Sequence, residues 1–146
     1  MIRIIAVGKK HAPELSRAID QYECRLRHPF TVEWQLLPYS AKQGDAARIE
    51  ESRAIMQQIK PQAKVVLLDE RGDSLSSDSF ANVLIQGNVT IVIGGAYGVD
   101  DALRQRADTV ISLSRMVFPH QLVRLILLEQ IYRAQAIVNH HPYHHI

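Results

Sequence analysis

Three apolar runs in this sequence are short enough for strands and apolar along almost their whole length. They are Ile2–Val7, the stretch between the charged ends of Lys64–Asp69, and Val89–Ile93. Strands of this kind are typical of a parallel sheet that is covered on both faces. Segments with helical spacing separate the runs throughout the chain. The alternation predicts an α/β fold in which helices lie on both faces of a mainly parallel sheet.

The remaining segments complete this alternation. Apolar and polar residues alternate from Phe30 to Leu36, which predicts a half-exposed strand near the sheet edge, ended by Pro38. A last strand is expected at Thr109–Leu113. Pro13 suits the first turn of a helix. The other expected helices are Gly44–Ile59, Ser77–Gln86, Asp100–Ala107 and Phe118–Val138.

The length of 146 residues suits one domain with a sizeable core. Hydrophobic residues make up 47% and charged residues 22%, the balance of an ordinary soluble protein. The single cysteine, Cys24, excludes an internal disulfide framework and a multi-cysteine zinc site, and we expect it to be buried or half-buried in a reducing compartment. No apolar run approaches the roughly 18 residues of a membrane span. The first apolar run precedes its charges, which predicts a strand rather than a signal peptide, and a cytoplasmic protein.

The net charge of +2 is lower than a typical nucleic-acid-binding domain carries. Basic residues nevertheless gather towards both ends of the chain, and four of the seven histidines lie in the tail NHHPYHHI. A local basic face therefore stays open as an alternative to an ordinary solvated surface.

The strand Val89–Ile93 leads directly into glycines, in the sequence IGGAYG. The spacing of Gly94, Gly95 and Gly98 does not match the dinucleotide fingerprint, and no P-loop lysine follows. Parallel sheets bind ligands at the carboxyl ends of their strands. Three loops leave those ends, LLDERG, IGGAYG and SLSRMVFPH, and we expect them to meet in one pocket. The alternative for the glycine pair is a tight turn without a ligand.

The last expected helix has more apolar surface than one face can hold. Apolar residues between Leu122 and Tyr132 go most of the way round it. A helix of this kind is buried on several sides. A second copy of the chain is the expected cover, and a central core helix in a monomer is the alternative.

Three motifs follow one another in the last third of the chain: IGGAYGVD, SLSRMVFPHQLVRLILLEQIYRA and NHHPYHHI. With the VGK after the first strand and the central LLDERG, they resemble the ribosomal RNA large subunit methyltransferase H family of the SPOUT class. The resemblance spans residues 1–146 and implies a single domain with a deep C-terminal trefoil knot that holds S-adenosyl-L-methionine. It also implies a homodimer that methylates N3 of a pseudouridine in large-subunit ribosomal RNA, in a stem-loop near the decoding region. The implied partner is the ribosome or its RNA, and no metal is implied.

The same resemblance implies the site residues. Leu68 would lie by the adenine of the cofactor, and Gly94 with Gly95 would bring bare backbone against its ribose and methionine portions. In the motif HPYH, Tyr143 would hold the acceptor base and His144 would accept the N3 proton. The knot loop would wrap the adenine edge, largely through main-chain groups, with Leu113, Ser114, Arg115, Met116, Val117 and Phe118.

We expect the tail to act as a mobile lid over the cofactor, within its own subunit or across the dimer. Pro142 prevents the last helix from continuing, and the tail has few apolar atoms to bury. His140 and His145 lie outside the matched motif and receive no role. His120 either orients the substrate or caps the last helix.

Arg124 and Arg133 lie on the last helix with Glu129 between them. They form an ion network or reach RNA phosphate.

Two other functions stay open. The spacings 140/144 and 141/145 would suit metal ligands on a helix, but Pro142 interrupts that helix and no carboxylate or cysteine is near. A ribosome-binding module of the same fold could lack catalysis. Binding of S-adenosylmethionine would separate an enzyme from such a module.

Overall fold

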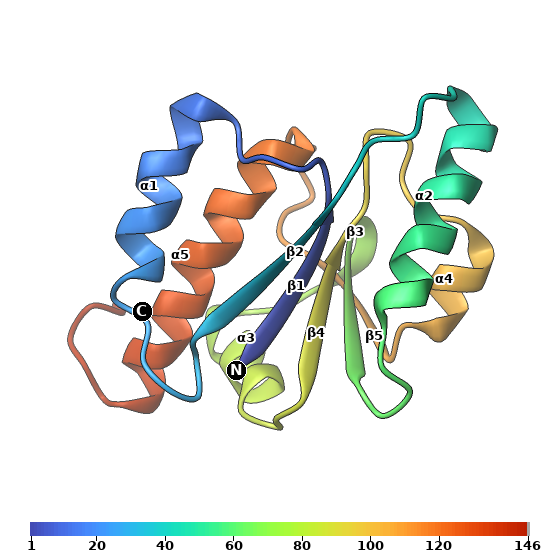
Figure 1. Ribbon diagram of the computed structural model, residues 1–146. Coiled ribbons are helices and arrows are strands. Elements are labelled where there is room, and N and C mark those ends of the chain that lie inside the picture. Colours follow the sequence, from blue (N-terminus) through green and yellow to red (C-terminus); the bar gives the residue numbers. More distant parts are fainter. Residues whose placement is uncertain (146) are drawn as a thin grey trace.

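The computed structural model describes residues 1–145, and its centre is a five-stranded sheet (Figure 1). The strand order is β2-β1-β4-β3-β5, and all neighbouring strands are parallel. The strands are β1 (Ile2–Val7), β2 (Val32–Leu37), β3 (Lys64–Ser74), β4 (Val89–Ile93) and β5 (Thr109–Ser112). The helices are α1 (Pro13–Glu23), α2 (Gly44–Gln58), α3 (Ser77–Leu84), α4 (Asp101–Arg106) and α5 (His120–Val138).

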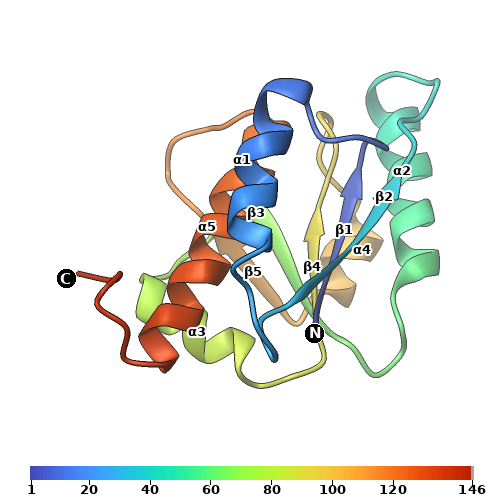
Figure 2. The same cartoon turned by 60° about the vertical axis from the view of Figure 1, so that its left-hand side comes forward.

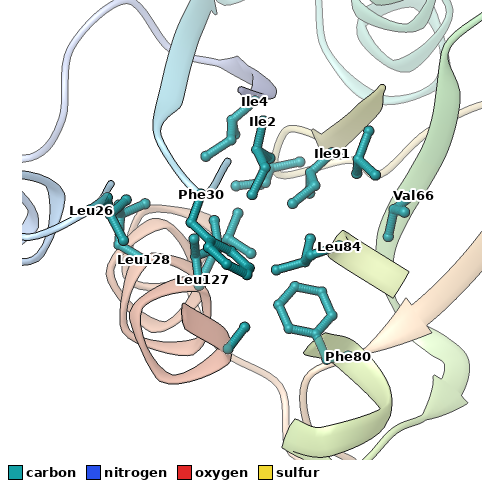
Figure 3. Packing of buried hydrophobic residues seen from close by; sticks show 14 of the residues in the cluster. Ile2, Ile4, Leu26, Phe30, Val66, Phe80, Leu84, Ile91, Leu127 and Leu128 are labelled. Carbon is teal, nitrogen blue, oxygen red and sulfur yellow. The ribbon is translucent and has the colours of Figure 1, made fainter. Parts of the chain in front are cut away.

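The helices form a layer on each face of the sheet. α1, α3 and α5 lie on one side, and α2 and α4 lie on the other (Figures 1 and 2). Each layer encloses its own buried cluster. Phe30, Phe80 and Leu127 belong to the larger cluster, under α3 and α5 (Figure 3). Ile55 of α2 and Leu103 of α4 belong to the second cluster, on the opposite face.

The central strands contribute to both clusters. Ile4 belongs to the larger cluster and Ile5 to the second one, because successive side chains of a strand point to opposite faces. Both are fully buried, so β1 has to be apolar along its length. β2 lies at the edge and mixes buried with exposed positions. The expected parallel α/β sheet with a half-exposed edge strand is confirmed.

Local signals set where the helices begin. Pro13 occupies the first position of α1. The Ser76 side chain caps α3 by accepting from the Ser79 N–H, and Asp100 caps α4 by accepting from the Leu103 N–H. None of the helices between residues 1 and 145 is long and apolar enough to cross a membrane.

β3 continues beyond its expected end and is irregular where it passes β5. Leu68 and Asp73 both align with Ile111, with a register shift between them. Gly72 lies in this shift, and a Cβ there would come within 2.7 Å of the β5 backbone. Only glycine permits such a close approach of two backbones. The trefoil knot itself stays a prediction from the family resemblance.

The expectation that Cys24 is buried or half-buried is wrong, because its side chain is exposed. Cys24 follows the last residue of α1, and its thiol donates to the Gln21 carbonyl at 3.3 Å. Ile19 and Leu26 are the buried residues of this segment. Cys24 is the residue that caps the end of α1, and its side chain packs into neither buried cluster of residues 1–145.

Candidate functional site

A cavity of about 580 Å³ lies at the carboxyl ends of β4 and β5, beside the middle of β3. Its walls are a segment of β3, the two loops that leave β4 and β5, and the first turn of α5. The lining residues are 68–71, 93–99, 112–114, 116–120 and Val123. The volume lies within the range of pockets that hold small molecules and cofactors. The expected meeting of the three segments in one pocket is confirmed, although the first of them continues β3 instead of forming a loop.

The cavity brings together most of the residues that the family resemblance assigns to the cofactor. Arg115 differs, because it is exposed and is not among the lining residues. The others line the cavity: Leu68, Gly94, Gly95, Leu113, Ser114, Met116, Val117 and Phe118. Their contacts with a cofactor stay predictions.

The two glycines after β4 let neighbouring side chains approach the backbone closely. A Cβ on Gly94 would lie 2.9 Å from Val99 Cγ1, and a Cβ on Gly95 would lie 2.6 Å from Glu51 Oε1. Gly98, with φ of 78°, closes the turn by donating its N–H to the Gly95 carbonyl at 3.0 Å. These glycines let the turn pack tightly, and the cavity meets bare backbone at both positions. Their contact with the cofactor stays a prediction.

Two serines shape the loop after β5. The Ser112 hydroxyl donates to the Ser114 carbonyl at 2.5 Å, and the Ser114 hydroxyl accepts from the Met116 N–H at 3.0 Å. These bonds turn the chain and leave Met116 and Val117 at the cavity with 74% and 72% of their surface exposed. Large exposed apolar side chains beside a cavity suit an apolar ligand surface such as a purine ring.

His120 lines the cavity and is held by a short hydrogen-bonded chain. The Gln121 side-chain oxygen accepts from the Ala12 N–H at 2.9 Å, which sets the orientation of its amide, and the amide nitrogen donates to the Tyr39 hydroxyl at 3.3 Å. Because the Tyr39 oxygen accepts this bond, its own proton can be donated to His120 Nε2, 2.9 Å away. Burial, and next the charge of Arg124, lower the pKa of His120, so its imidazole is neutral at pH 7.

Arg124 is fully buried behind His120. Its guanidinium donates to the carbonyls of Val7 and Gly8, at 2.8 and 3.0 Å, and to the Lys10 carbonyl at 3.0 Å. Burial lowers the pKa of Arg124. The alternatives of an ion network or an RNA contact therefore do not describe Arg124. Its spacing from Leu127, on the buried face of α5, is the sequence signal that marks it as internal.

Asp69 is an acidic residue of the cavity wall that is paired with Arg104. Burial acts to raise the pKa of the Asp69 carboxyl, but hydrogen bonds from the Arg71 N–H and from Arg104 outweigh burial, so the pKa is lowered. Arg104 Nη2 lies 2.5 Å from Asp69 Oδ2. Asp69 is therefore a carboxylate that anchors α4 to the end of β3.

The tail lies at the other end of α5 from the cavity. The cavity meets the first turn of α5, and the helix has 19 residues, which span about 28 Å. Neither Tyr143 nor His144 lines the cavity. Within one described chain, residues 1–145, the two catalytic candidates and the cofactor loops are therefore apart.

Tyr143 packs on α5. Its ring meets Tyr132 edge to face, with centroids 4.7 Å apart, and the Arg133 guanidinium lies 4.9 Å from its ring centroid. Its hydroxyl donates to Glu129 Oε1 at 3.3 Å. Burial, a hydrogen bond with Tyr22 and the charge of Glu129 raise the pKa of Tyr143 to about 12. The phenol is therefore a hydrogen-bond donor at neutral pH.

His144 is also held in place. Arg133 Nη1 donates to His144 Nδ1 at 3.1 Å, and His144 Nε2 lies 3.7 Å from Asp78 of α3. Arg133 pairs with Glu129 at 2.7 Å, so the ion network expected for this arginine is present. The tail thus packs against α5 and α3, which differs from the expected lid that is free of the fold. Aromatic and charged contacts replace the apolar atoms that the tail lacks.

The cavity fits S-adenosylmethionine in size and in the groups around it. Met116, Val117 and Leu68 offer apolar surface, and the two turns offer backbone N–H and carbonyl groups. Behind Gly95, the buried Glu51 Oε1 has no hydrogen-bond partner within residues 1–145. Sequence reasoning missed Glu51, although Ala47, Glu51 and Ile55 share one buried helix face. Among the described residues, no three His, Cys, Asp or Glu side chains gather into a group that could hold a metal ion.

Comparison with known proteins shows which family the chain belongs to. The model of the family described as "Predicted SPOUT methyltransferase" matches residues 1–144. The chain is 41% identical to ribosomal RNA large subunit methyltransferase H of Geobacter sulfurreducens, with 99% of each chain covered. It is 39% identical to the protein of the same name from Porphyromonas gingivalis, with 99% of this chain and 98% of the relative covered.

A solved structure shares the fold. The SpoU methyltransferase AviRb from Streptomyces viridochromogenes, crystallised with the cofactor AdoMet, superposes with a TM-score of 0.50 at 14% identity. The match covers 92% of this chain and 57% of AviRb. The likeness to AviRb concerns the fold alone, whereas the full-length relatives define the family. The chain therefore belongs to the ribosomal RNA large subunit methyltransferase H family of SPOUT methyltransferases.

Proposed function

We propose that this protein transfers the methyl group of S-adenosylmethionine to large-subunit ribosomal RNA. The acceptor is N3 of a pseudouridine in a stem-loop near the decoding region. The observation that carries the proposal is the cavity of about 580 Å³, built from a segment of β3 and the loops after β4 and β5 in a chain of this family. The cofactor supplies an activated methyl group on a sulfonium, so the protein's main task is to align acceptor and donor.

The cavity residues take the binding roles. Leu68 and the exposed Met116 and Val117 cover the adenine, and main-chain groups of residues 113–118 recognise its edge. The turn at Gly94 and Gly95 faces the ribose and methionine portions. Each of these contacts is a main-chain or van der Waals contact. The Ser114 hydroxyl shapes the loop by accepting a hydrogen bond from the Met116 N–H.

The tail takes the acceptor roles. The N3 proton has to leave when the methyl group arrives, so a base is required. Tyr143, whose raised pKa keeps it protonated, donates a hydrogen bond to the base or stacks on it. His144 accepts the N3 proton at Nδ1, the nitrogen that accepts a hydrogen bond from Arg133 in the single chain. Release of His144 from Arg133 accompanies substrate binding.

The length of α5 favours a site shared by two chains. The tail of one chain is about 28 Å of helix away from its own cavity. A homodimer packed along α5 lets the tail reach the partner's cavity, and it covers Leu122 and Ile126, which are half-buried in the single chain. Residues 1–146 act as one methyltransferase domain in this assembly.

The RNA approaches the cavity from the side of the loop after β1. Lys9 and Lys10 are exposed there, and the Lys10 carbonyl is fixed by Gln121 and Arg124 at the start of α5. Lysines beside a cavity suit phosphate contacts. The protein works in the cytoplasm, where ribosomes are assembled and used.

Mass mapping of ribosomal RNA tests the function. Ribosomal RNA from cells without the protein should lack one methyl group on one large-subunit pseudouridine, and the purified protein with S-adenosylmethionine should restore it on ribosomes. The alternative, a ribosome-binding module without catalysis, predicts unchanged RNA masses and no calorimetric binding of S-adenosylmethionine. Either of those results contradicts the proposal.

A further inference from the structure

Glu51 of α2 is a buried acid that is only half satisfied. Its residue surface is 5% exposed. Oε2 accepts a hydrogen bond from the Ser40 N–H at 3.0 Å, whereas Oε1 has no partner among residues 1–145. Burying a carboxylate oxygen without a partner is costly, so such an atom in a folded protein calls for an explanation.

The free oxygen lies directly behind the cavity wall. A Cβ on Gly95 would be 2.6 Å from Oε1. The carboxylate can lie against this turn because Gly95 has no side chain. Gly95 and His120 both line the cavity. The charge of Glu51 acts to raise the pKa of His120, against burial and Arg124, so its field reaches the cavity.

Two other charged groups near this wall are already engaged. Asp69 pairs with Arg104 at 2.5 Å, and Arg124 is held by carbonyl groups. Glu70 also lines the cavity, but it is exposed to solvent, which screens its charge. Among the described residues at this cavity, Glu51 is therefore the buried carboxylate with an oxygen left to act on a ligand at the Gly95 side. A cation there gains more than it would in water, because the surroundings are buried and polarise little.

We infer that Glu51 is a cofactor-binding residue that attracts the cationic methionine end of S-adenosylmethionine. The inference rests on the proposed function, which places that end of the cofactor at Gly94 and Gly95. Two cationic groups are available there, the sulfonium and the α-ammonium. Glu51 favours the cofactor over ligands without these charges, and it leaves the adenine contacts unchanged.

Calorimetry with three ligands tests the inference without relying on activity. S-adenosylmethionine carries both cations, S-adenosylhomocysteine carries the ammonium only, and methylthioadenosine carries neither. Glu51→Gln keeps the size of the side chain and an acceptor for the Ser40 N–H. We expect it to weaken S-adenosylmethionine by roughly tenfold and methylthioadenosine by less than about twofold. S-adenosylhomocysteine then follows the first ligand if the ammonium is the partner, and the last ligand if it is the sulfonium.

The matched control is Glu50→Gln. Glu50 precedes Glu51 on the same helix, but it is exposed and pairs with Lys42 at 3.1 Å. Glu50→Gln removes the same charge from the protein, and the affinities for all three ligands should stay within about twofold of the wild-type values. If Glu51→Gln fails to fold, Glu51→Asp takes its place, because the shorter side chain withdraws the carboxylate from Gly95 and should produce a smaller loss with the same selectivity.

Equal weakening of all three ligands would overturn the inference, since it would show a distorted cavity. Unchanged affinities would overturn it as well. A wild-type protein that binds none of the three contradicts the proposed function itself, and the inference with it. Wild-type binding combined with an unselective Glu51 variant contradicts the inference alone.

Discussion

Arg124 Nη2 donates a hydrogen bond to the Val7 carbonyl over 2.8 Å, so the start of α5 is joined to the end of β1. The same guanidinium serves the carbonyls of Gly8 and Lys10. Arg124→Met leaves all three carbonyls without this donor. We expect the free energy of unfolding to fall by about 2–4 kcal/mol, because the cost of the orphaned carbonyls is partly offset by removing a buried charge. Urea denaturation measures the change.

Arg17→Met is the control for that substitution. Arg17 is exposed on α1, so its replacement should change the free energy of unfolding by less than about 0.5 kcal/mol. If the two variants are equally stable, the bonds from Arg124 to the end of β1 contribute nothing net.

Gly94 and Val99 form a second pair whose fit can be tested. The Cβ of Gly94→Ala would lie 2.9 Å from Val99 Cγ1, so the turn between them has to shift at the cavity wall. We expect the affinity for S-adenosylmethionine to fall by roughly tenfold. Adding Val99→Ala removes the obstructing methyl group and should bring the affinity back to within about threefold of wild type. Calorimetry on the four proteins of this cycle decides. A double variant as weak as Gly94→Ala would mean that the contact is not the cause.

Stability should fall in mild acid because of two half-buried histidines. Burial, and next the charge of Arg124, lower the pKa of both His11 and His120 below the ordinary 6.5. The unfolded chain then binds protons that the folded chain resists. The resulting stability is fully present above pH 6.5 and is lost as the pH falls towards the lowered values. Denaturation midpoints at pH 8 and pH 5.5 should differ less in the His11→Gln, His120→Gln double variant. The exposed His145→Gln should leave the wild-type difference unchanged.

Oligomeric state follows from the outer face of α5. Leu122 and Ile126 are one turn apart and half-buried in the single chain. Sedimentation at micromolar concentration should show a dimer for the wild type and a folded monomer for Leu122→Glu with Ile126→Glu, because unpaired carboxylates cannot be buried at an apolar interface without a large cost. Ile49→Glu, at an exposed position of α2, should remain a dimer. A wild-type monomer would refute the proposed assembly.

The reach of the tail can be tested by mixing two inactive chains. One ends at Val138 and keeps its cavity, and the other carries Gly94→Val and keeps its tail. Each should fold and dimerise, and neither alone should methylate ribosomes. After joint refolding, roughly a quarter of wild-type activity should return if tails serve the partner's cavity, since half of the dimers are mixed and each has one complete site. No recovery would place each tail at its own cavity.

The sheet could be predicted because its evidence is local. β1 and β4 are apolar throughout since they are buried on both faces, and the polar alternation of β2 follows from its edge position. The loops of the cavity could be predicted for a related reason. Parallel strands put their carboxyl ends at one edge, so the segments after Ile93 and Ser112 had to meet. The segment after Leu68 joins them because Leu68 is paired with Ile93, although β3 itself continues to Ser74.

Contacts between distant segments could not be predicted in this way. Glu51 looks like any acid on a solvated helix, and only the packing of α2 against the turn at Gly95 makes it internal. The close approach of Val99 to Gly94 depends on the fold of the turn in the same way, so the spacing of the glycines does not reveal it. The position of the tail depends on a contact between the aromatic rings of Tyr143 and Tyr132. The hydrophobic periodicity of the sequence does not predict this contact.

The bond between Arg124 and Val7 spans 117 residues of sequence, and it sets an order of events during synthesis. β1 leaves the ribosome before α5. Until α5 emerges, the end of β1 has no guanidinium to satisfy its carbonyls, and the cavity has no fourth wall at His120. A nascent chain whose α5 is still inside the ribosome therefore cannot hold the cofactor. Each copy of the protein becomes competent to bind it only after the ribosome has delivered α5.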